Sequence, residues 1–186
     1  YTNESAEPLV VDLADDVRGF RTKGSFLGTD WFEAVDPADR CGYAVAERSG
    51  EILPIDRRKT TKIELAPGGS IVRDMLIGVA RSPLEAVSNI LAQTRDTGVV
   101  RISVVSADGS PISDARLELL HGKEKVVGYP NSDGRMDLAI PPGEFRLRAS
   151  AIGRGVATAE FTIRTWMDAE ASLELPRLSG ARFQVT

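Results

Sequence analysis

The sequence predicts an all-β fold that contains a single helix. Through residues 98–176, apolar and polar residues alternate in short segments, and Gly, Pro and Asp-Gly pairs separate these segments as they separate the strands of a β-sandwich. Only residues 82–96 repeat their apolar side chains at helical spacing. We therefore expect a β-rich unit over residues 1–97 that ends in a helix, a sandwich over residues 98–176, and the start of a further strand or domain over residues 177–186.

Short, irregular strands are predicted for the first unit. Residues 1–8 are polar and are expected to be frayed. The run over residues 71–80 is continuously apolar, which predicts a strand buried on both faces. The other candidate strands cover residues 10–13, 24–32, 43–47 and 59–65, with turns at Asp36-Pro37, Ser49-Gly50 and Pro67-Gly68-Gly69.

The helix over about residues 82–96 has clear end signals. Ser82 is a good N-cap, Pro83 fits the first helical position, and Glu85 stands where the acid of a capping box belongs. The helical stripe consists of Leu84, Val87, Ile90 and Leu91. We expect this helix to cover a sheet or to act as a hinge between the halves; a helix that fills a partner's groove is the alternative.

Six segments of the second half place apolar residues at every other position, which predicts half-buried strands. Their turns are Asp108-Gly109, Asp133-Gly134, Pro141-Pro142-Gly143 and Gly153-Arg154-Gly155. The inward residues are Val100, Ile102, Val104; Ala115, Leu117, Leu119; Met136, Leu138, Ile140; Phe145, Leu147, Ala149; Phe161, Ile163; and Leu173, Leu175.

The order of these segments resembles the carboxypeptidase regulatory-like family over residues 98–176. The resemblance is carried by ADGSPISDARLEL, by NSDGRMDLAIPPGEFRLRASAIGRG and by the closing LEL strand. It implies a seven-stranded transthyretin-like, Ig-like β-sandwich. Members of the family are non-catalytic accessory domains of peptidases, outer-membrane receptors and other secreted proteins, so the resemblance also implies a secreted, periplasmic or cell-surface location.

A second resemblance covers residues 17–97. The stretch FLGTDWFEAVDPADRCGYAVAERSG, followed by IVRDMLIGVARSP and the helix, is similar to the N-terminal region of large secreted phosphoesterases of the PHP type (polymerase and histidinol phosphatase), which depend on metals. In that architecture a mutarotase-like β piece precedes the regulatory-like sandwich and the metal-binding barrel follows. The His-rich metal motifs have no counterpart here, because His121 is the only histidine.

Composition excludes several classes of function. A net charge of −4 favours neither nucleic acid nor an anionic membrane as a partner. The sequence has no apolar run of membrane-spanning length and no signal peptide, and the single Cys41 rules out an internal disulfide or a Cys-based metal site. Because the chain begins at Tyr1 and ends in a strand-like stretch over residues 183–186, we expect a segment of a longer protein.

One cluster of aromatic and acidic residues is a candidate ligand site. Trp31 follows Asp30 and precedes Phe32, and Tyr43 lies on the next predicted strand. Aromatic ring faces stack on the apolar faces of pyranoses, so these four residues are the candidate sugar-binding residues; core packing is the alternative. Trp166 is expected in a loop or at a strand end, where its ring would plug the edge of the sandwich.

No catalytic, cofactor-binding or metal-binding residue is predicted. His121 has no carboxylate or thiol partner at a recognisable spacing. Asp108 with Asp114, and Asp133 with Asp137, lack the alternating carboxylates and the distal Glu of a calcium loop, so turn formation explains them better. A nucleophile elbow of the G-x-S-x-G type is also missing from the sequence.

Three functions remain open from the sequence. The favoured one is a non-catalytic accessory or structural module that positions a neighbouring domain of the same polypeptide. The second is carbohydrate binding around Trp31. The third is the N-terminal region of a metal-dependent phosphoesterase whose catalytic domain lies outside this chain. Expected partners are the neighbouring domain and either a carbohydrate or another protein, without nucleic acid and without membrane insertion.

Overall fold

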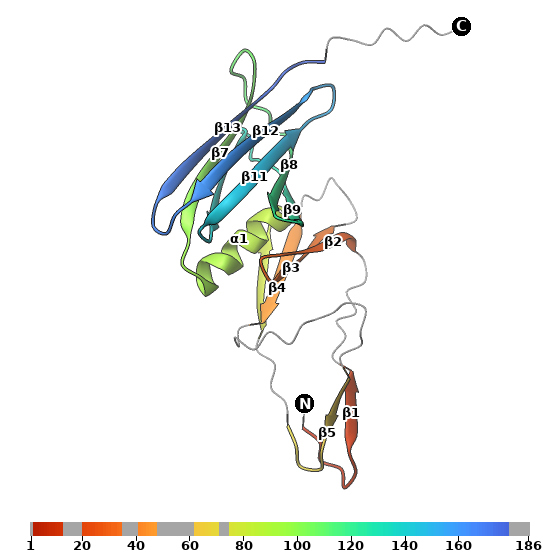
Figure 1. Ribbon diagram of the computed structural model, residues 1–186. Coiled ribbons are helices and arrows are strands. Elements are labelled where there is room, and N and C mark those ends of the chain that lie inside the picture. The colour runs from red at the N-terminus through yellow and green to blue at the C-terminus, as the bar shows by residue number, and fades with distance from the viewer. Residues whose placement is uncertain (1, 13–19, 35–40, 48–61, 71–74, 179–186) are drawn as a thin grey trace, which may run out of the picture. The chain divides into compact units, whose positions relative to one another are not determined.

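A computed structural model of the chain confirms the all-β architecture with one helix (Figure 1). The structure describes residues 2–12, 20–34, 41–47, 62–70 and 75–178. Contacts within the chain define two compact units, the first made of residues 1–19 with 47–76 and the second of residues 20–46 with 77–186. The division into residues 1–97 and 98–176 that the sequence suggests stays a prediction about domains.

The first unit contains the antiparallel pair β1 (Leu9–Asp12) and β5 (Lys62–Leu65). Asn3 is 1% exposed, and its side-chain Nδ2 donates to the carbonyls of Glu7 and Leu65, both at 2.8 Å. Its backbone N–H donates to the carbonyl of Gly69 at 2.9 Å. The expectation that residues 1–8 are frayed is therefore wrong at Asn3, because an amide side chain satisfies two carbonyls at once.

The second unit begins with a four-stranded sheet. Its strands are β2 (Phe20–Phe26), β3 (Thr29–Ala34), β4 (Gly42–Glu47) and β6 (Met75–Ala80), in the order β2-β3-β4-β6. The expected turns at Asp36-Pro37 and Ser49-Gly50, and the start of the apolar run over residues 71–74, lie outside the described residues.

A tight hairpin replaces the single strand expected over residues 24–32. Leu27 and Gly28 both have positive φ, at 50° and 75°, as the two central residues of a two-residue hairpin turn do. Two contacts hold this turn: the Leu27 N–H donates to Glu124 Oε2 at 2.9 Å, and Arg95 Nη2 donates to the Leu27 carbonyl at 2.8 Å. Leucine seldom occupies such a position, so the sequence carries no turn signal there.

Strand β6 is also less buried than its apolar sequence predicts. Ile77 and Val79 are 65% and 67% exposed, whereas Gly78 between them is buried. A Cβ at Gly78 would come within 2.7 Å of the carbonyl oxygen of Ala86, so this glycine allows the helix to approach one face of the sheet. The expectation of burial on both faces is wrong, because β6 packs against the helix on one face only.

Helix α1 (Pro83–Thr94) confirms the predicted start signals. Ser82 is the N-cap, its Oγ accepts from the Glu85 N–H, and Pro83 opens the first turn. The carboxylate of Glu85 accepts from the guanidinium of Arg81. Seven residues of the helix are buried, which is more than one stripe, so the helix packs against neighbours on more than one side: Pro83, Leu84, Ala86, Val87, Ser88, Ile90 and Leu91.

Seven strands form the sandwich, as predicted. They are β7 (Gly98–Ser106), β8 (Arg116–His121), β9 (Glu124–Gly128), β10 (Arg135–Ile140), β11 (Gly143–Ser150), β12 (Val156–Ile163) and β13 (Asp168–Leu175). One sheet has the order β10-β7-β13 and the other β12-β11-β8-β9. Strand β13 pairs with β7 in parallel, whereas the other ladders of the sandwich are antiparallel.

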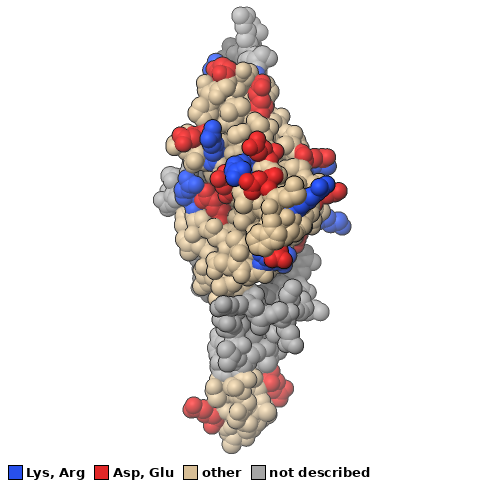
Figure 2. All heavy atoms as spheres, turned by 90° about the vertical axis from the view of Figure 1, so that its left-hand side faces the viewer, with Lys and Arg blue, Asp and Glu red and all other residues tan. Residues whose placement is uncertain are grey.

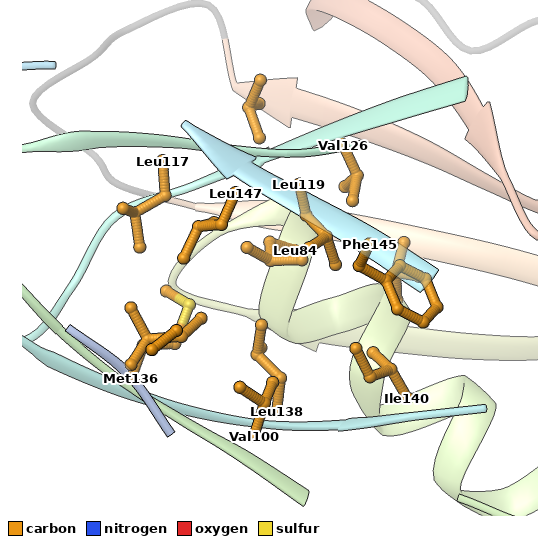
Figure 3. Close-up of a cluster of buried hydrophobic side chains, with 14 of the residues drawn as sticks. Leu84, Val100, Leu117, Leu119, Val126, Met136, Leu138, Ile140, Phe145 and Leu147 are labelled. Carbon is orange, nitrogen blue, oxygen red and sulfur yellow. The ribbon is translucent and has the colours of Figure 1, made fainter. Parts of the chain in front are cut away.

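The core is continuous from the sandwich through α1 to the hairpin sheet. Figure 3 shows Leu84 of α1 among side chains from both sandwich sheets, with Leu119 and Leu147 on one side and Val100 and Leu138 on the other. Trp31 and Ala44 belong to the same buried cluster, and the Ser88 hydroxyl of α1 accepts from the Ala139 N–H on β10 at 2.9 Å. The described residues 20–34, 41–46 and 77–178 therefore share one core.

Candidate functional site

The predicted sugar-binding cluster lies mainly in this core. Trp31 is 2% exposed, and its indole Nε1–H donates to the Lys125 carbonyl on β9 at 3.0 Å. Phe32 is 7% exposed and stacks on Tyr43, with ring centroids 4.6 Å apart. Asp30 is half-buried and lies opposite Val45 across the β3–β4 ladder. The indole of Trp31 thus joins two sheets, and sugar binding by this cluster stays a prediction.

A groove runs over the outer face of the sheet β10-β7-β13. Its volume is about 800 Å³, and its walls come from the start of α1, from the loop before β10 and from the three strands. Side chains alternate along a strand, so the polar residues that stand between the buried residues of β7, β10 and β13 point to this face. The lining residues are Arg81, Glu85, Arg101, Ile102, Ser103, Asn131, Asp133, Arg135, Met136, Asp137, Glu170, Ala171 and Ser172.

Charges of both signs are interleaved in this groove. Arg101 on the central strand lies opposite Asp137 on β10 and opposite Glu170 on β13, and its guanidinium pairs with Asp168 at 2.8 Å. Figure 2 views the molecule from the side on which β7 and β13 lie in Figure 1, and it shows blue and red side chains side by side on that face. Opposite charges across neighbouring strands stabilise the sheet, so these pairs have a structural role in addition to any contact with a ligand.

One wall of the groove is a turn that Asn131 organises. Its side-chain oxygen accepts from the N–H groups of Asp133, at 3.0 Å, and of Arg135, at 2.9 Å. Gly134 has a φ of 68°, and a Cβ there would come within 2.5 Å of the Val104 carbonyl oxygen, so this turn requires glycine. The sequence prediction that Asp133 takes part in turn formation agrees with this geometry.

A second polar cluster links the hairpin sheet to the sandwich. The Tyr129 hydroxyl donates to Glu33 Oε1 at 2.7 Å and accepts from Arg116 Nη1 at 3.0 Å. Burial is the main cause that raises the pKa of Tyr129 above its ordinary value of 10.0, and the hydrogen bond to Glu33 adds to it. The phenol therefore remains protonated, and the cluster connects β3 to β8 rather than supplying a base.

Asp108 is the other titratable group with a shifted pKa. Its carboxylate accepts from the Ser106 hydroxyl and from the Ser110 N–H at 3.1 Å, and these hydrogen bonds lower its pKa to about 2. The same bonds close the turn at Gly109, which has a φ of 80°. This arrangement is the turn chemistry that the sequence predicts for Asp108.

His121 and Trp166 lie at the surface of the sandwich. His121 Nδ1 is 3.1 Å from the Glu144 carbonyl oxygen, and its ring packs 5.0 Å from that of Phe145. Trp166 is 80% exposed, so the expectation that it plugs the sandwich edge is wrong. The Trp166 backbone N–H donates to the Thr97 carbonyl at 3.2 Å, which holds the turn between β12 and β13 to the residue before β7.

Neither a metal centre nor a membrane span is found in the described parts of the chain. Within these ranges, no three His, Cys, Asp or Glu side chains converge as ligands for a metal ion. The helix that the structure describes lacks the length and apolar character needed to cross a bilayer.

Comparisons with known proteins identify no family for this chain. No protein-family model matches the chain, and no curated protein matches its sequence. Among solved structures, a 3-chlorocatechol 1,2-dioxygenase from Rhodococcus opacus is similar at 10% identity and a TM-score of 0.36, over 45% of this chain and 60% of that one. The Bacillus anthracis TIE protein is similar at 10% identity and a TM-score of 0.41, over 84% of this chain and 27% of that one.

A minor pilin of Streptococcus agalactiae is similar at 15% identity and a TM-score of 0.38, over 83% of this chain and 67% of that one. The chain thus spans 60% of the dioxygenase and 27% of the TIE protein. TM-scores below 0.5 at such identities support no inference about activity, ligand or assembly. The three similar structures are a dioxygenase, the TIE protein and a pilin, which are different kinds of protein.

Proposed function

We propose that the chain is a non-catalytic accessory module of a larger, secreted protein and that it holds a neighbouring domain in a fixed orientation. The observation that supports this most directly is the continuous core of residues 20–34, 41–46 and 77–178. A module that orients its neighbour has to resist bending between its own parts, and a shared core supplies that resistance. The strand and turn order of residues 98–176 supports membership of the carboxypeptidase regulatory-like family.

Side-chain contacts reinforce the junction between the hairpin sheet and the sandwich. The Trp31 indole is bonded to β9, the Leu27 N–H to Glu124, and the Tyr129 hydroxyl to Glu33. These contacts join residues 94, 97 and 96 positions apart in the sequence. A hinge between the two parts would require all three to break together, so the helix acts as a cover rather than as a hinge.

Rotational diffusion measured by ¹⁵N relaxation tests the rigidity of the module. We expect one diffusion tensor to fit the amides of residues 20–34 and 77–178, because both belong to one compact unit. Two separate correlation times for β2–β3 and for the sandwich would contradict the proposal. The non-catalytic role is tested by incubating the chain with bis(p-nitrophenyl) phosphate in the presence of Mn²⁺ or Zn²⁺: no turnover is expected, and metal-dependent turnover would contradict it.

A further inference from the structure

The turn between β12 and β13 places a tryptophan where glycine is favoured. Met167 N–H donates to the Arg164 carbonyl at 3.2 Å and closes a four-residue turn, in which Trp166 is the third residue with a φ of 60°. Turns with positive φ at this position favour glycine, because a Cβ clashes with the backbone there. Among the described non-glycine residues, Leu27 and Trp166 have positive φ, and Leu27 is packed against the core.

Local stability does not explain this tryptophan. Holding a residue other than glycine in the left-handed region costs about 1–2 kcal/mol. The ring recovers little by burial, since 80% of Trp166 is exposed. The turn itself is fixed by its surroundings, because a Cβ at Gly98 would come within 2.5 Å of the Arg164 carbonyl oxygen and 2.6 Å of the Met167 carbonyl oxygen. Strained residues that persist on a rigid scaffold are typical of ligand-binding positions.

The turn that carries Trp166 lies at the start of β7 and β13, two of the strands that form the groove. Asp168, two residues further along the chain, pairs with Arg101 at 2.8 Å, and both side chains are about half exposed. Arg101 also lines the groove over β10-β7-β13. Hydroxyl groups follow on the same face, where the Ser103 hydroxyl donates to that of Ser172 at 3.1 Å. The turn with the exposed tryptophan therefore stands at one end of a row of groups that donate and accept hydrogen bonds.

We propose that this face binds a neutral oligosaccharide, with the Trp166 ring stacked on one pyranose and the groove residues bonded to the hydroxyls of the following sugars. Carboxylates, guanidinium groups, hydroxyls and an amide together match sugar hydroxyls, which both donate and accept. The groove carries three arginines and four acids, so it does not favour a polyanion: Arg81, Arg101, Arg135, Glu85, Asp133, Asp137 and Glu170.

Two other partners fit this face less well. A protein interface centred on Trp166 would need apolar surroundings. Among residues 164–168, Met167 is the only other exposed large apolar residue. An anionic membrane is not specifically attracted either, because Asp168 beside the turn pairs with Arg101 and leaves Arg164 as the single remaining cation of residues 164–168. This binding role goes beyond the proposed function as an orienting module, and it assigns the stacking ring to Trp166 instead of the buried Trp31.

Calorimetric titration of the chain with cellohexaose, mannohexaose, xylohexaose and chitohexaose tests the proposal. We expect at least one hexasaccharide to bind, and Trp166→Gly to weaken its binding by about tenfold or more. The same variant is expected to keep or raise the melting temperature, because glycine relieves the backbone strain at this position. Asp137→Ala is expected to weaken binding of the same hexasaccharide, because Asp137 lines the groove. Ile152→Ala serves as the matched control, since Ile152 is 97% exposed in a different turn.

Three outcomes would overturn the proposal. The first is that none of the four hexasaccharides binds at millimolar concentration. The second is that a hexasaccharide binds the wild type and the Trp166→Gly variant equally well. The third is that the chain binds vesicles of phosphatidylcholine with phosphatidylglycerol through Trp166 and binds no sugar, which would assign the exposed ring to a membrane surface. None of these outcomes bears on the rigidity of the module, which the relaxation experiment measures separately.

Discussion

A methyl group added at Gly24 should loosen the junction between the hairpin sheet and the sandwich. In Gly24→Ala, the new Cβ would lie 2.5 Å from Cε2 and Cζ2 of Trp31 and 2.6 Å from its Nε1. Carbon atoms pack at about 3.5–4.0 Å, so the ring has to move by about 1 Å or more. That movement breaks the hydrogen bond from Trp31 Nε1 to the Lys125 carbonyl, which is 3.0 Å long.

The expected cost follows from these two effects. Overpacking of a core costs about 1–3 kcal/mol, and the lost hydrogen bond adds about 1 kcal/mol. A total of about 3 kcal/mol lowers the melting temperature by about 6–12 °C in a chain of this size. Gly109→Ala is the matched control, because it adds the same methyl group where nothing lies within 4 Å. Its expected cost is about 1 kcal/mol, from the positive φ alone.

Thermal unfolding followed by two probes measures the effect. With Trp166→Phe as the background, Trp31 is the only fluorescent indole and reports on the junction, while far-UV circular dichroism reports on all strands. We expect both transitions to shift together, because one core unites residues 20–34, 41–46 and 77–178. A melting temperature equal to that of Gly109→Ala, or a shift in the fluorescence transition alone, would refute this reasoning.

Three further predictions concern the core and the two shifted groups. Leu84→Ala should lower the free energy of unfolding by about 2–5 kcal/mol in chemical denaturation, because Leu84 is 1% exposed among both sandwich sheets. The low pKa of Asp108 stabilises the fold above pH 3.8, and this contribution is lost as the pH falls toward about 2. Carboxyl NMR of the wild type, with Asp108→Asn to assign the signal, measures this pKa. A titration midpoint of Asp108 near 3.8 would contradict the prediction. The raised pKa of Tyr129 stabilises the fold below pH 10.0, and this contribution is lost as the pH rises through the folded-state pKa. Phenolate absorbance against pH, compared between the wild type and Tyr129→Phe, measures this pKa. A midpoint for Tyr129 at or below 10.0 would contradict the prediction.

The sandwich and the helix start could be predicted because local rules decide them. Burial of one sheet face imposes a period of two, and that period locates the inward residues of β7, β10 and β11. The Ser82 cap and Pro83 satisfy backbone requirements within one turn, so they are visible in the sequence. The hairpin at Leu27 was not predictable, because its turn is held by Glu124 and Arg95, which are distant in the chain.

The candidate site was less accessible to sequence reasoning. Local sequence favours Trp31, because Asp30 and Phe32 adjoin it, whereas the acid nearest Trp166 is Asp168, two positions away. In the fold, the Trp31 ring is bonded to β9 and is 2% exposed, whereas Trp166 is 80% exposed. The groove depends on the parallel pairing of β7 with β13, which joins residues 69 positions apart, such as Val99 and Asp168, and leaves no periodic signal. The expected position of Trp166 in a loop or at a strand end was the one sign in the sequence, because bulky side chains are rare in turns.

The parallel pairing of β7 and β13 also determines how the sandwich bears a pulling force. The N-terminal end of β7 and the C-terminal end of β13 lie at opposite ends of a ladder that extends from Asp168 opposite Val99 to Leu175 opposite Ser106. Tension applied through the chain at these two ends acts along the strands, so the hydrogen bonds of the ladder are loaded together in shear. In an antiparallel pair pulled from one end, they would open one after another. The sandwich is therefore built to transmit tension between the segments on either side of it.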